Sequence, residues 1–257
     1  MSTSTETFRK PLNRSGYFLD SGNLEQIQKW KELIGGVTTN QVILFSKEGI
    51  TNIPEHLNAM CEITGPGVPI SLELPDSNWS IEKMVALAEY YYHIHPDNTV
   101  IKVPILPKDV KGLKIITILS KKGIPTNATI GMSFGQLTMA AEAARTYTGQ
   151  GANYISLFWG RTQESVERYQ EGILPQRLLE ATLAYLINHQ LDDTKIIVGS
   201  IREPIQVIEA FSLGADIVTV PPSILESLLY NRRADETVEE FNSAFKAVEN
   251  TITLDYI

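Results

Sequence analysis

A lysine interrupts one of the most apolar stretches of the sequence. Lys102 lies within NTVIKVPIL, residues 98–106, and β-branched residues flank it on both sides. A run of this kind, bounded by Asn98 and Pro104, is typical of a strand buried on both faces. Burial disfavours the charged form of an amine, and an uncharged amine is a nucleophile toward carbonyl carbon. The stretch indicates either a Schiff-base lysine or a lysine at a strand end whose ammonium reaches water.

Other polar residues stand at or just beyond the ends of further short apolar runs. They are acids, amides, hydroxyls and arginines: Asp20, Thr39, Asn40, Glu73, Asn127, Thr129, Ser156, Arg161, Ser200 and Arg202. In a barrel of parallel strands these side chains converge, because active sites form at the carboxyl ends of the strands. Acids, an amine and guanidinium groups together suit a small anionic carbonyl compound. The pattern therefore predicts one active site.

Repeated strand and helix patterns supply the elements that would position these residues. Eight apolar runs predict strands, at residues 17–19, 36–38, 70–73, 100–103, 126–130, 154–158, 195–199 and 217–220. Apolar residues at three- and four-residue spacing predict helices between them, at residues 23–33, 80–94, 108–123, 133–147 and 174–190. Eight such units favour the α/β class and a single (β/α)8 TIM barrel rather than an open sheet.

The predicted barrel has a segment at each end. Residues 1–16 are polar and predict a flexible tail, residues 17–234 form the barrel, and residues 235–257 hold an extra helix, DETVEEFNSAFKAVEN, and a second tail. The helix follows the eighth unit and is amphipathic, so it must pack outside the barrel or on another subunit. A subunit interface in a homo-oligomer is the expected use.

Composition argues against several classes of partner. The chain has 257 residues, 43% of them hydrophobic, so it can bury a sizeable core. Its net charge is −8 and it has no basic block, so nucleic acid and anionic membranes are not expected partners. No run approaches the roughly 20 apolar residues of a membrane span. Cys61 is the only cysteine, which rules out an internal disulfide and favours a reducing, cytoplasmic location.

The sequence gives no sign of a metal or a nucleotide cofactor. The four histidines lie in helical or loop stretches without the spacing of metal ligands. Glycine-rich phosphate loops are absent from the junctions between strands and helices. We therefore expect no metal and no cofactor.

An ordered set of motifs resembles the transaldolase family, most closely its short-chain members. The motifs are YFLDSGN, GGVTTN, VIKVP, GIPTNATI, YISLFWGR and IIVGSIREP, with GADIVTVPPSILESLL as the closing segment. The resemblance covers roughly residues 17–249 and implies an α/β barrel whose strand-four lysine, here Lys102, forms a Schiff base. The family's small members assemble as pentamers or decamers through a C-terminal helix.

The resemblance also implies an activity. A dihydroxyacetone unit would pass from an anionic ketose to an aldehyde, in the pentose phosphate pathway or a sulfosugar pathway. The ketose would be fructose 6-phosphate or an analogue such as 6-deoxy-6-sulfofructose.

Catalytic roles follow residue by residue from the same resemblance. Asp20 matches the acid/base aspartate that exchanges a proton with the C4 hydroxyl. Glu73 and Thr129 match the pair that positions a water during imine formation and hydrolysis. The alternatives are a helix N-cap for Asp20, an exposed edge position for Glu73 and an ordinary strand residue for Thr129.

Binding roles form two groups. Contacts to the donor would come from Asn40, Asn127, Ser156 and the aromatic Phe158, for which the alternatives are strand-end capping and core packing. The terminal phosphate or sulfonate would bind to Arg161, Ser200 and Arg202, for which a surface salt bridge is the alternative.

Several residues depart from the family pattern. Gln41 replaces a Pro, Leu157 replaces another Pro, Trp159 replaces a small aliphatic residue, and IGMSF, residues 130–134, replaces a bulkier run. These changes are expected to line the substrate walls, so they leave the identity of the substrate open. A hydrolytic fructose-6-phosphate aldolase, which releases free dihydroxyacetone, is a second possibility, although that subfamily has Gln and Tyr where this chain has Glu73 and Phe158. A barrel that binds a sugar acid without catalysis is a third.

Overall fold

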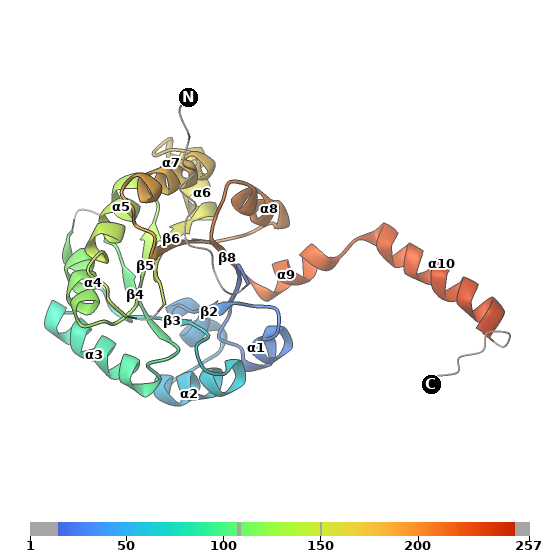
Figure 1. Cartoon of the computed structure of the whole chain (residues 1–257), viewed down its shortest axis with the longest axis horizontal. Helices are drawn as coiled ribbons and strands as arrows, with labels where there is room; N and C mark the ends of the chain where they lie inside the picture. Colours follow the sequence, from blue (N-terminus) through green and yellow to red (C-terminus); the bar gives the residue numbers. More distant parts are fainter. Residues whose placement is uncertain (1–14, 107–108, 150, 250–257) are drawn as a thin grey trace, which may run out of the picture.

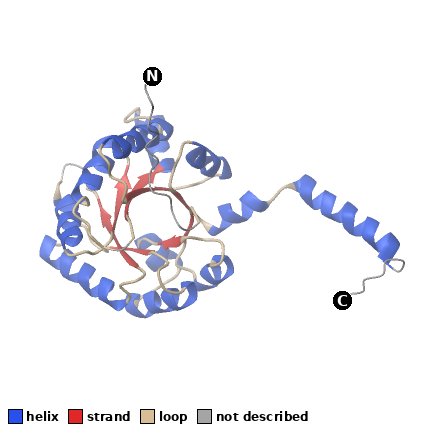
Figure 2. Cartoon of the chain, viewed as in Figure 1, coloured by secondary structure: helices blue, strands red, loops and turns tan. Residues whose placement is uncertain are grey.

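A closed barrel of eight parallel strands forms the centre of the molecule (Figure 1, Figure 2). The computed structural model describes residues 15–106, 109–149 and 151–249. Strand β1 pairs with both β2 and β8, which closes the ring. The predicted TIM barrel is therefore confirmed. Most of the tail predicted at residues 1–16, and residues 250–257 of the C-terminal region, lie outside the described residues.

Every strand lies where the sequence predicts it, within one residue at either end. The strands are β1 (Tyr17–Asp20), β2 (Gly36–Thr38), β3 (Ile70–Glu73), β4 (Thr99–Pro104), β5 (Thr126–Gly131), β6 (Asn153–Phe158), β7 (Thr194–Gly199) and β8 (Ile217–Val220). Aliphatic and β-branched residues dominate them because both faces are covered, one by the barrel interior and one by helices.

Helices α1 to α8 form an outer layer around the barrel, and the chain leaves this layer through α9 and α10 (Figure 2). The helices of the described chain are α1 (Leu24–Trp30), the π-helix η1 (Val42–Lys47), α2 (Ile53–Thr64), α3 (Ile81–Ile94), α4 (Lys111–Lys121), α5 (Phe134–Ala143), α6 (Trp159–Tyr169), α7 (Pro175–Asn188), α8 (Pro204–Ser212), α9 (Pro222–Leu229) and α10 (Arg232–Val248). Side-chain caps start several of them, as Asn23 does for α1 and Ser80 for α3.

The last helix begins earlier than the sequence pattern indicated. The Asn231 side chain accepts a hydrogen bond from the Ala234 amide, so α10 starts at Arg232 rather than at residue 235. None of its residues is buried, and it projects away from the barrel (Figure 1). No helix in the described part of the chain is both long and apolar enough to span a membrane.

An apolar layer closes the base of the barrel interior. Its five buried side chains come from five different strands: Phe18, Val100, Tyr154, Ile197 and Ile217. The outward residues of the same strands, such as Ile101 and Val103, join the main core beneath the helices. Because side chains alternate along a strand, the next inward position lies two residues nearer the carboxyl end.

Those next inward positions are mainly polar. Two residues beyond Phe18, Val100, Tyr154 and Ile217 come Asp20, Lys102, Ser156 and Thr219, and all four line one cavity. The polar residues therefore lie above the apolar layer, at the carboxyl ends of the strands.

Candidate active site

A cavity of about 530 Å³ opens at the carboxyl ends of the strands. Eight of the predicted site residues line it: Asp20, Asn40, Glu73, Lys102, Ser156, Phe158, Arg161 and Ser200. Asn127 and Thr129 are fully buried behind this lining, and Arg202 lies outside it. The barrel thus brings together most of the residues that the sequence placed at strand ends.

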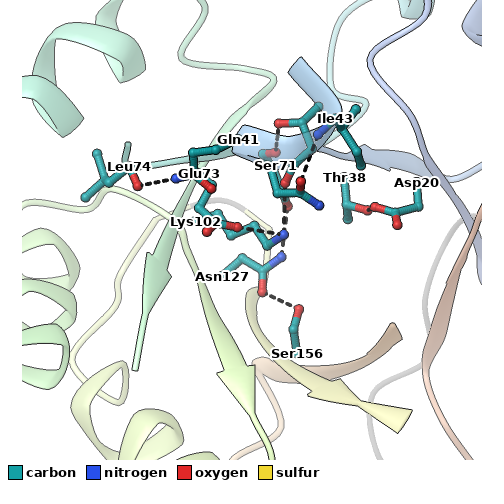
Figure 3. Close-up of polar contacts among 12 residues, drawn as sticks. Asp20, Thr38, Gln41, Ile43, Ser71, Glu73, Leu74, Lys102, Asn127 and Ser156 are labelled. Atoms are coloured by element: carbon teal, nitrogen blue, oxygen red, sulfur yellow. Dashed lines mark hydrogen bonds and ion pairs between the residues drawn. The ribbon is translucent and has the colours of Figure 1, made fainter. Parts of the chain in front are cut away.

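Lys102 points into the interior, where its amine has two polar partners. Its Nζ atom lies 3.0 Å from Glu73 Oε2 and donates to the Thr39 carbonyl at 2.9 Å (Figure 3). Glu73 and Lys102 are direct partners in the register of β3 and β4, which fixes this pair. The lysine side chain is only 5% exposed, so the alternative of an ammonium that reaches bulk water is wrong.

Asp20 lies at the end of β1 and borders the same cavity. Its Oδ1 accepts a hydrogen bond from Thr38 Oγ1 at 2.8 Å, and Thr38 Oγ1 lies 2.5 Å from Thr219 Oγ1. Burial raises the pKa of Asp20 above its usual value, while Lys102, the Thr38 hydrogen bond and Lys47 lower it by a smaller amount. The N-cap of α1 is Asn23, so the capping alternative for Asp20 is wrong.

A buried hydrogen-bond chain supports the cavity on the side of β5. Asn127, the register partner of Lys102, donates through Nδ2 to Ser71 Oγ at 3.0 Å and accepts from Ser156 Oγ at 2.7 Å (Figure 3). Asn127 therefore orients Ser156, which lines the cavity, and does not itself border the cavity. The buried Thr129 hydroxyl has no hydrogen-bond partner among the described residues.

Asn40 and the π-helix η1 form the wall next to β2. Asn40 Oδ1 accepts from the Ile43 amide at 2.9 Å, so this side chain caps the turn that follows β2. The Glu48 amide donates to the Ile43 carbonyl at 3.1 Å, five residues back, as in a π-helix. This wide turn brings both Val42 and Lys47 to the cavity.

The predicted anion site is only partly assembled. Arg161 and Ser200 line the cavity, and Ser200 has a left-handed backbone with φ of +58°. Arg202 instead pairs with Glu164, its Nη2 atom lying 2.8 Å from Glu164 Oε2, and its side chain is 51% exposed. For Arg202 the structure therefore agrees with the salt-bridge alternative.

Comparison with known proteins identifies the family to which this chain belongs. The profile of the transaldolase/fructose-6-phosphate aldolase family matches residues 17–256. A probable transaldolase of Syntrophobacter fumaroxidans is 35% identical over 239 residues, which cover 91% of this chain and 97% of the relative. The chain belongs to this family.

Other relatives are similar over comparable lengths. A probable transaldolase of Caldicellulosiruptor saccharolyticus is 37% identical and covers 87% of this chain and 94% of its own length. One from Methanococcus maripaludis is 33% identical and covers 91% of this chain and 99% of its own. This protein is therefore an enzyme of the aldolase and transferase type.

A solved structure resembles the fold at low sequence identity. A putative dihydrodipicolinate synthase family protein from Coccidioides immitis matches with a TM-score of 0.54 and 9% identity, over 82% of this chain and 67% of its own. This likeness shows the barrel architecture alone.

Only some of the departures from the transaldolase pattern border the cavity. Gln41, Ile130 and Met132 line it. Gln41 also donates from Nε2 to the Leu74 carbonyl at 2.6 Å. Leu157 and Trp159 pack in the main hydrophobic core instead. The expectation that they would form substrate walls is wrong for these two, because Leu157 is an outward residue of β6 and Trp159 starts α6 inside the core.

Sequence reasoning missed several cavity residues of this transaldolase-family site. Thr38 and Thr219 occupy inward positions of predicted strands, so strand alternation could have found them. Lys47 reaches the cavity through a π-turn, which has no sequence signal. Ile130 belongs to the segment 130–134 that was expected at the substrate wall, but the strand irregularity beside it has no sequence signal either. Within the described residues, no group of three or more His, Cys, Asp and Glu side chains could hold a metal ion.

Proposed function

We propose that the enzyme transfers a dihydroxyacetone unit from an anionic ketose to an aldehyde through a Schiff base on Lys102. The observation that carries the proposal is the placement of the Lys102 amine. It borders a cavity shared with the Asp20 carboxyl, it is shielded from bulk water, and a carboxylate oxygen lies 3.0 Å away.

The first steps turn the amine into an electron sink. Glu73, whose Oε2 lies 3.0 Å from Nζ, is the carboxylate that can take the proton that Lys102 loses before it attacks the ketone carbon. Addition gives a carbinolamine, and loss of its hydroxyl as water gives the iminium ion. The Thr129 hydroxyl lies on the inward side of β5, as Asn127 does. There it can assist the water that leaves during iminium formation and returns during hydrolysis.

Asp20 then exchanges the proton that drives cleavage. The iminium draws electrons from the C3–C4 bond while the Asp20 carboxylate removes the C4 hydroxyl proton. The aldehyde half leaves, and a three-carbon enamine stays on Lys102. In the reverse sense the enamine attacks an acceptor aldehyde, and Asp20 returns the proton to the new hydroxyl. A raised pKa suits a group that must both take and give a proton.

Substrate contacts follow from the cavity lining. Asn40 keeps its Nδ2 group for a donor hydroxyl, since its Oδ1 is occupied by the Ile43 amide. Ser156 is held by Asn127, and Phe158 lines the cavity. Arg161 and Ser200 would bind the anionic tail, a phosphate as in fructose 6-phosphate or a sulfonate as in 6-deoxy-6-sulfofructose. Arg202 would have to leave Glu164 to join them.

The proposal also includes assembly into a homo-oligomer, a pentamer or decamer. Helix α10 carries a stripe of exposed apolar side chains at spacings of three, four and three: Val238, Phe241, Phe245 and Val248. A stripe with this spacing suits packing against another helix or barrel.

Borohydride trapping tests the central step. The enzyme is incubated with fructose 6-phosphate or 6-deoxy-6-sulfofructose, reduced with borohydride and digested for mass spectrometry. We expect a reduced dihydroxyacetone adduct on Lys102 that disappears in Lys102→Ala. Lys195→Met is the matched control, because Lys195 is also a buried lysine, 3% exposed, but does not border the cavity. Absence of an adduct with every ketose would favour a binding protein over an enzyme with this chemistry.

A second assay separates transfer from hydrolytic cleavage. Ketose consumption is measured with and without an acceptor aldehyde. Faster consumption with the acceptor supports the transferase. Equal rates, with free dihydroxyacetone accumulating, would instead support the fructose-6-phosphate aldolase activity that the family name includes.

A further inference from the structure

Four described residues other than glycine have a left-handed backbone, and two of them border the cavity. Gln170 and Gln190, both with φ of +55°, follow helices α6 and α7, where this conformation is common. Ile130 and Ser200, with φ of +67° and +58°, line the cavity and end no helix. For a β-branched residue such as Ile130 this conformation is a strained outlier, and such strain gathers at functional sites.

A β-bulge places the Ile130 side chain. Ala128 pairs with Ile155 and Gly131 pairs with Leu157, so β5 has one residue more than β6 between these two positions. Bulges of this kind turn a side chain to the other face of the sheet. Strict alternation from Asn127 and Thr129 would aim Ile130 outward, whereas it lines the cavity.

Contacts on both sides hold the bulge in place. The Thr129 carbonyl accepts from the Ile105 amide at 2.9 Å, and the Met132 amide donates to Gln136 Oε1 at 3.1 Å. A Cβ atom on Gly131 would lie 2.6 Å from the Ser156 carbonyl oxygen, so β5 approaches β6 here as only glycine allows. The left-handed backbone of Ile130 is thus imposed by its neighbours.

The position of Ile130 assigns it to one half of the substrate. Asn127 is level with Lys102, and Ile130 lies three residues further along β5, toward the carboxyl ends of the strands where the cavity opens. A ketose bound to Lys102 through its second carbon would keep its three-carbon donor unit deep in the barrel. The aldehyde half would extend toward the mouth, where Arg161 and Ser200 also border the cavity.

We propose that Ile130 is a specificity-determining residue. Its side chain, held in the cavity by the β5 bulge, limits the size of the aldehyde that can occupy the space beyond the reacting carbon. The inference rests on the proposed function, because it concerns the aldehyde that leaves or accepts the lysine-bound unit. Branched and aromatic aldehydes would be excluded by contact with this apolar wall.

Acceptor selectivity tests the role of the side chain. Wild type, Ile130→Gly and Ile130→Ala are assayed with glyceraldehyde, isobutyraldehyde and phenylacetaldehyde as acceptors. We expect the kcat/KM for phenylacetaldehyde, relative to that for glyceraldehyde, to rise about tenfold or more in both variants. Gln170→Gly, a change outside the cavity, should leave the ratio as in wild type. An unchanged ratio in both Ile130 variants would overturn the proposal.

Stability measurements test whether the left-handed backbone at Ile130 is imposed by its neighbours. Glycine in a strand is normally less stable than alanine, but at a left-handed position the order reverses. We expect a higher Tm for Ile130→Gly than for Ile130→Ala, the same order for the Gln170 pair, and the opposite order for Met132→Gly and Met132→Ala. A higher Tm for Ile130→Ala than for Ile130→Gly would contradict the imposed backbone.

Borohydride trapping on Lys102 distinguishes a failure of the Ile130 proposal from a failure of the proposed function. If borohydride traps a ketose on Lys102 in wild type and in both Ile130 variants while selectivity stays unchanged, the role of Ile130 fails and the proposed function stands. If nothing is trapped in wild type, the proposed function fails, and the selection of aldehydes by Ile130 fails with it.

Discussion

At the scale of single residues, two opposing effects act on the pKa of the Asp20 carboxyl group. Burial raises the pKa of Asp20, and the nearby ammonium groups of Lys102 and Lys47 oppose the rise without cancelling it. An aspartate with a raised pKa destabilises the folded state whenever it is ionised, because the unfolded chain solvates the charge better. The group proposed to move the proton therefore reduces stability at neutral pH.

Asp20→Asn should consequently stabilise the protein while removing its activity. We expect a higher Tm than wild type at pH 7 and a loss of cleavage of about 10²-fold or more. The gain in Tm should shrink as the pH falls through the raised pKa, since wild-type Asp20 then becomes neutral as well. Calorimetry at pH 7 and pH 5 measures the difference, with the exposed Asp97→Asn as the control. A lower Tm at pH 7 would contradict the expectation.

Lys47 should control the pH at which Asp20 works. Removing its charge in Lys47→Met takes away an influence that lowers the pKa of Asp20, so that pKa should rise further. The acid limb of the kcat/KM profile should then move to higher pH, whereas Lys47→Arg should keep it in place. Measurement of kcat/KM against pH for wild type, Lys47→Met and Lys47→Arg gives the position of the acid limb in each enzyme. An acid limb that is the same in Lys47→Met and wild type would show that Lys47 acts in another way.

At the scale of elements, the pairing of β1 and β2 depends on a missing side chain. Gly36 is the register partner of Phe18, and a Cβ atom on Gly36 would lie 2.5 Å from the Phe18 ring. Phe18 is fully buried in the layer that closes the base of the barrel. The ring therefore uses the space that any other residue at position 36 would fill.

Gly36→Ala should destabilise the barrel. Overpacking a core of this density costs about 1–3 kcal/mol, which for a chain of this size lowers the Tm by at least about 2 °C. Gly135→Ala is the matched control, since a Cβ atom there meets nothing within 4 Å and alanine favours the helix α5. Thermal unfolding should show a fall for the first variant and a rise for the second. A fall in both would mean that packing at Phe18 is not the cause.

What the sequence reveals about these elements depends on their regularity. The strands were predictable because apolar runs bounded by turn residues have few other interpretations, and Asp20, Glu73, Lys102 and Ser156 then follow from their places at strand ends. The β5 bulge and the π-turn of η1 each add one residue to a regular pattern, which hydrophobic periodicity does not reveal. Lys47 could therefore not be assigned to the cavity, and Ile130 was expected there only as part of the segment 130–134, without its left-handed backbone. The Arg202 pair with Glu164 is likewise a choice between two partners that only the fold settles.

At the scale of the whole molecule, α10 is the helix that has no buried residue among the described parts of the chain. Its apolar stripe is exposed, and Phe241 is 69% exposed. A protomer in isolation would present this stripe to water, which is consistent with the proposed assembly.

Placing charge in the stripe should separate the subunits. Phe241→Asp combined with Phe245→Asp should reduce the mass measured by light scattering to that of one chain, because buried carboxylates without partners are costly. Ser243→Asp adds one carboxylate on the opposite side of α10 and should leave the assembly intact. A single-chain mass for wild type itself would remove the basis for the proposed oligomer.

The closure of the ring by β1 and β8 also has a consequence during synthesis. Leu19 in β1 pairs with Val220 in β8, so the first strand to be synthesised cannot complete its pairing until the last strand has been synthesised. Until the ribosome has released that final strand, the nascent sheet has two open edges whose backbone groups can pair with other chains. Completion of the barrel must therefore come after translation of nearly the whole chain, and the interval before it is when chaperones would be needed most.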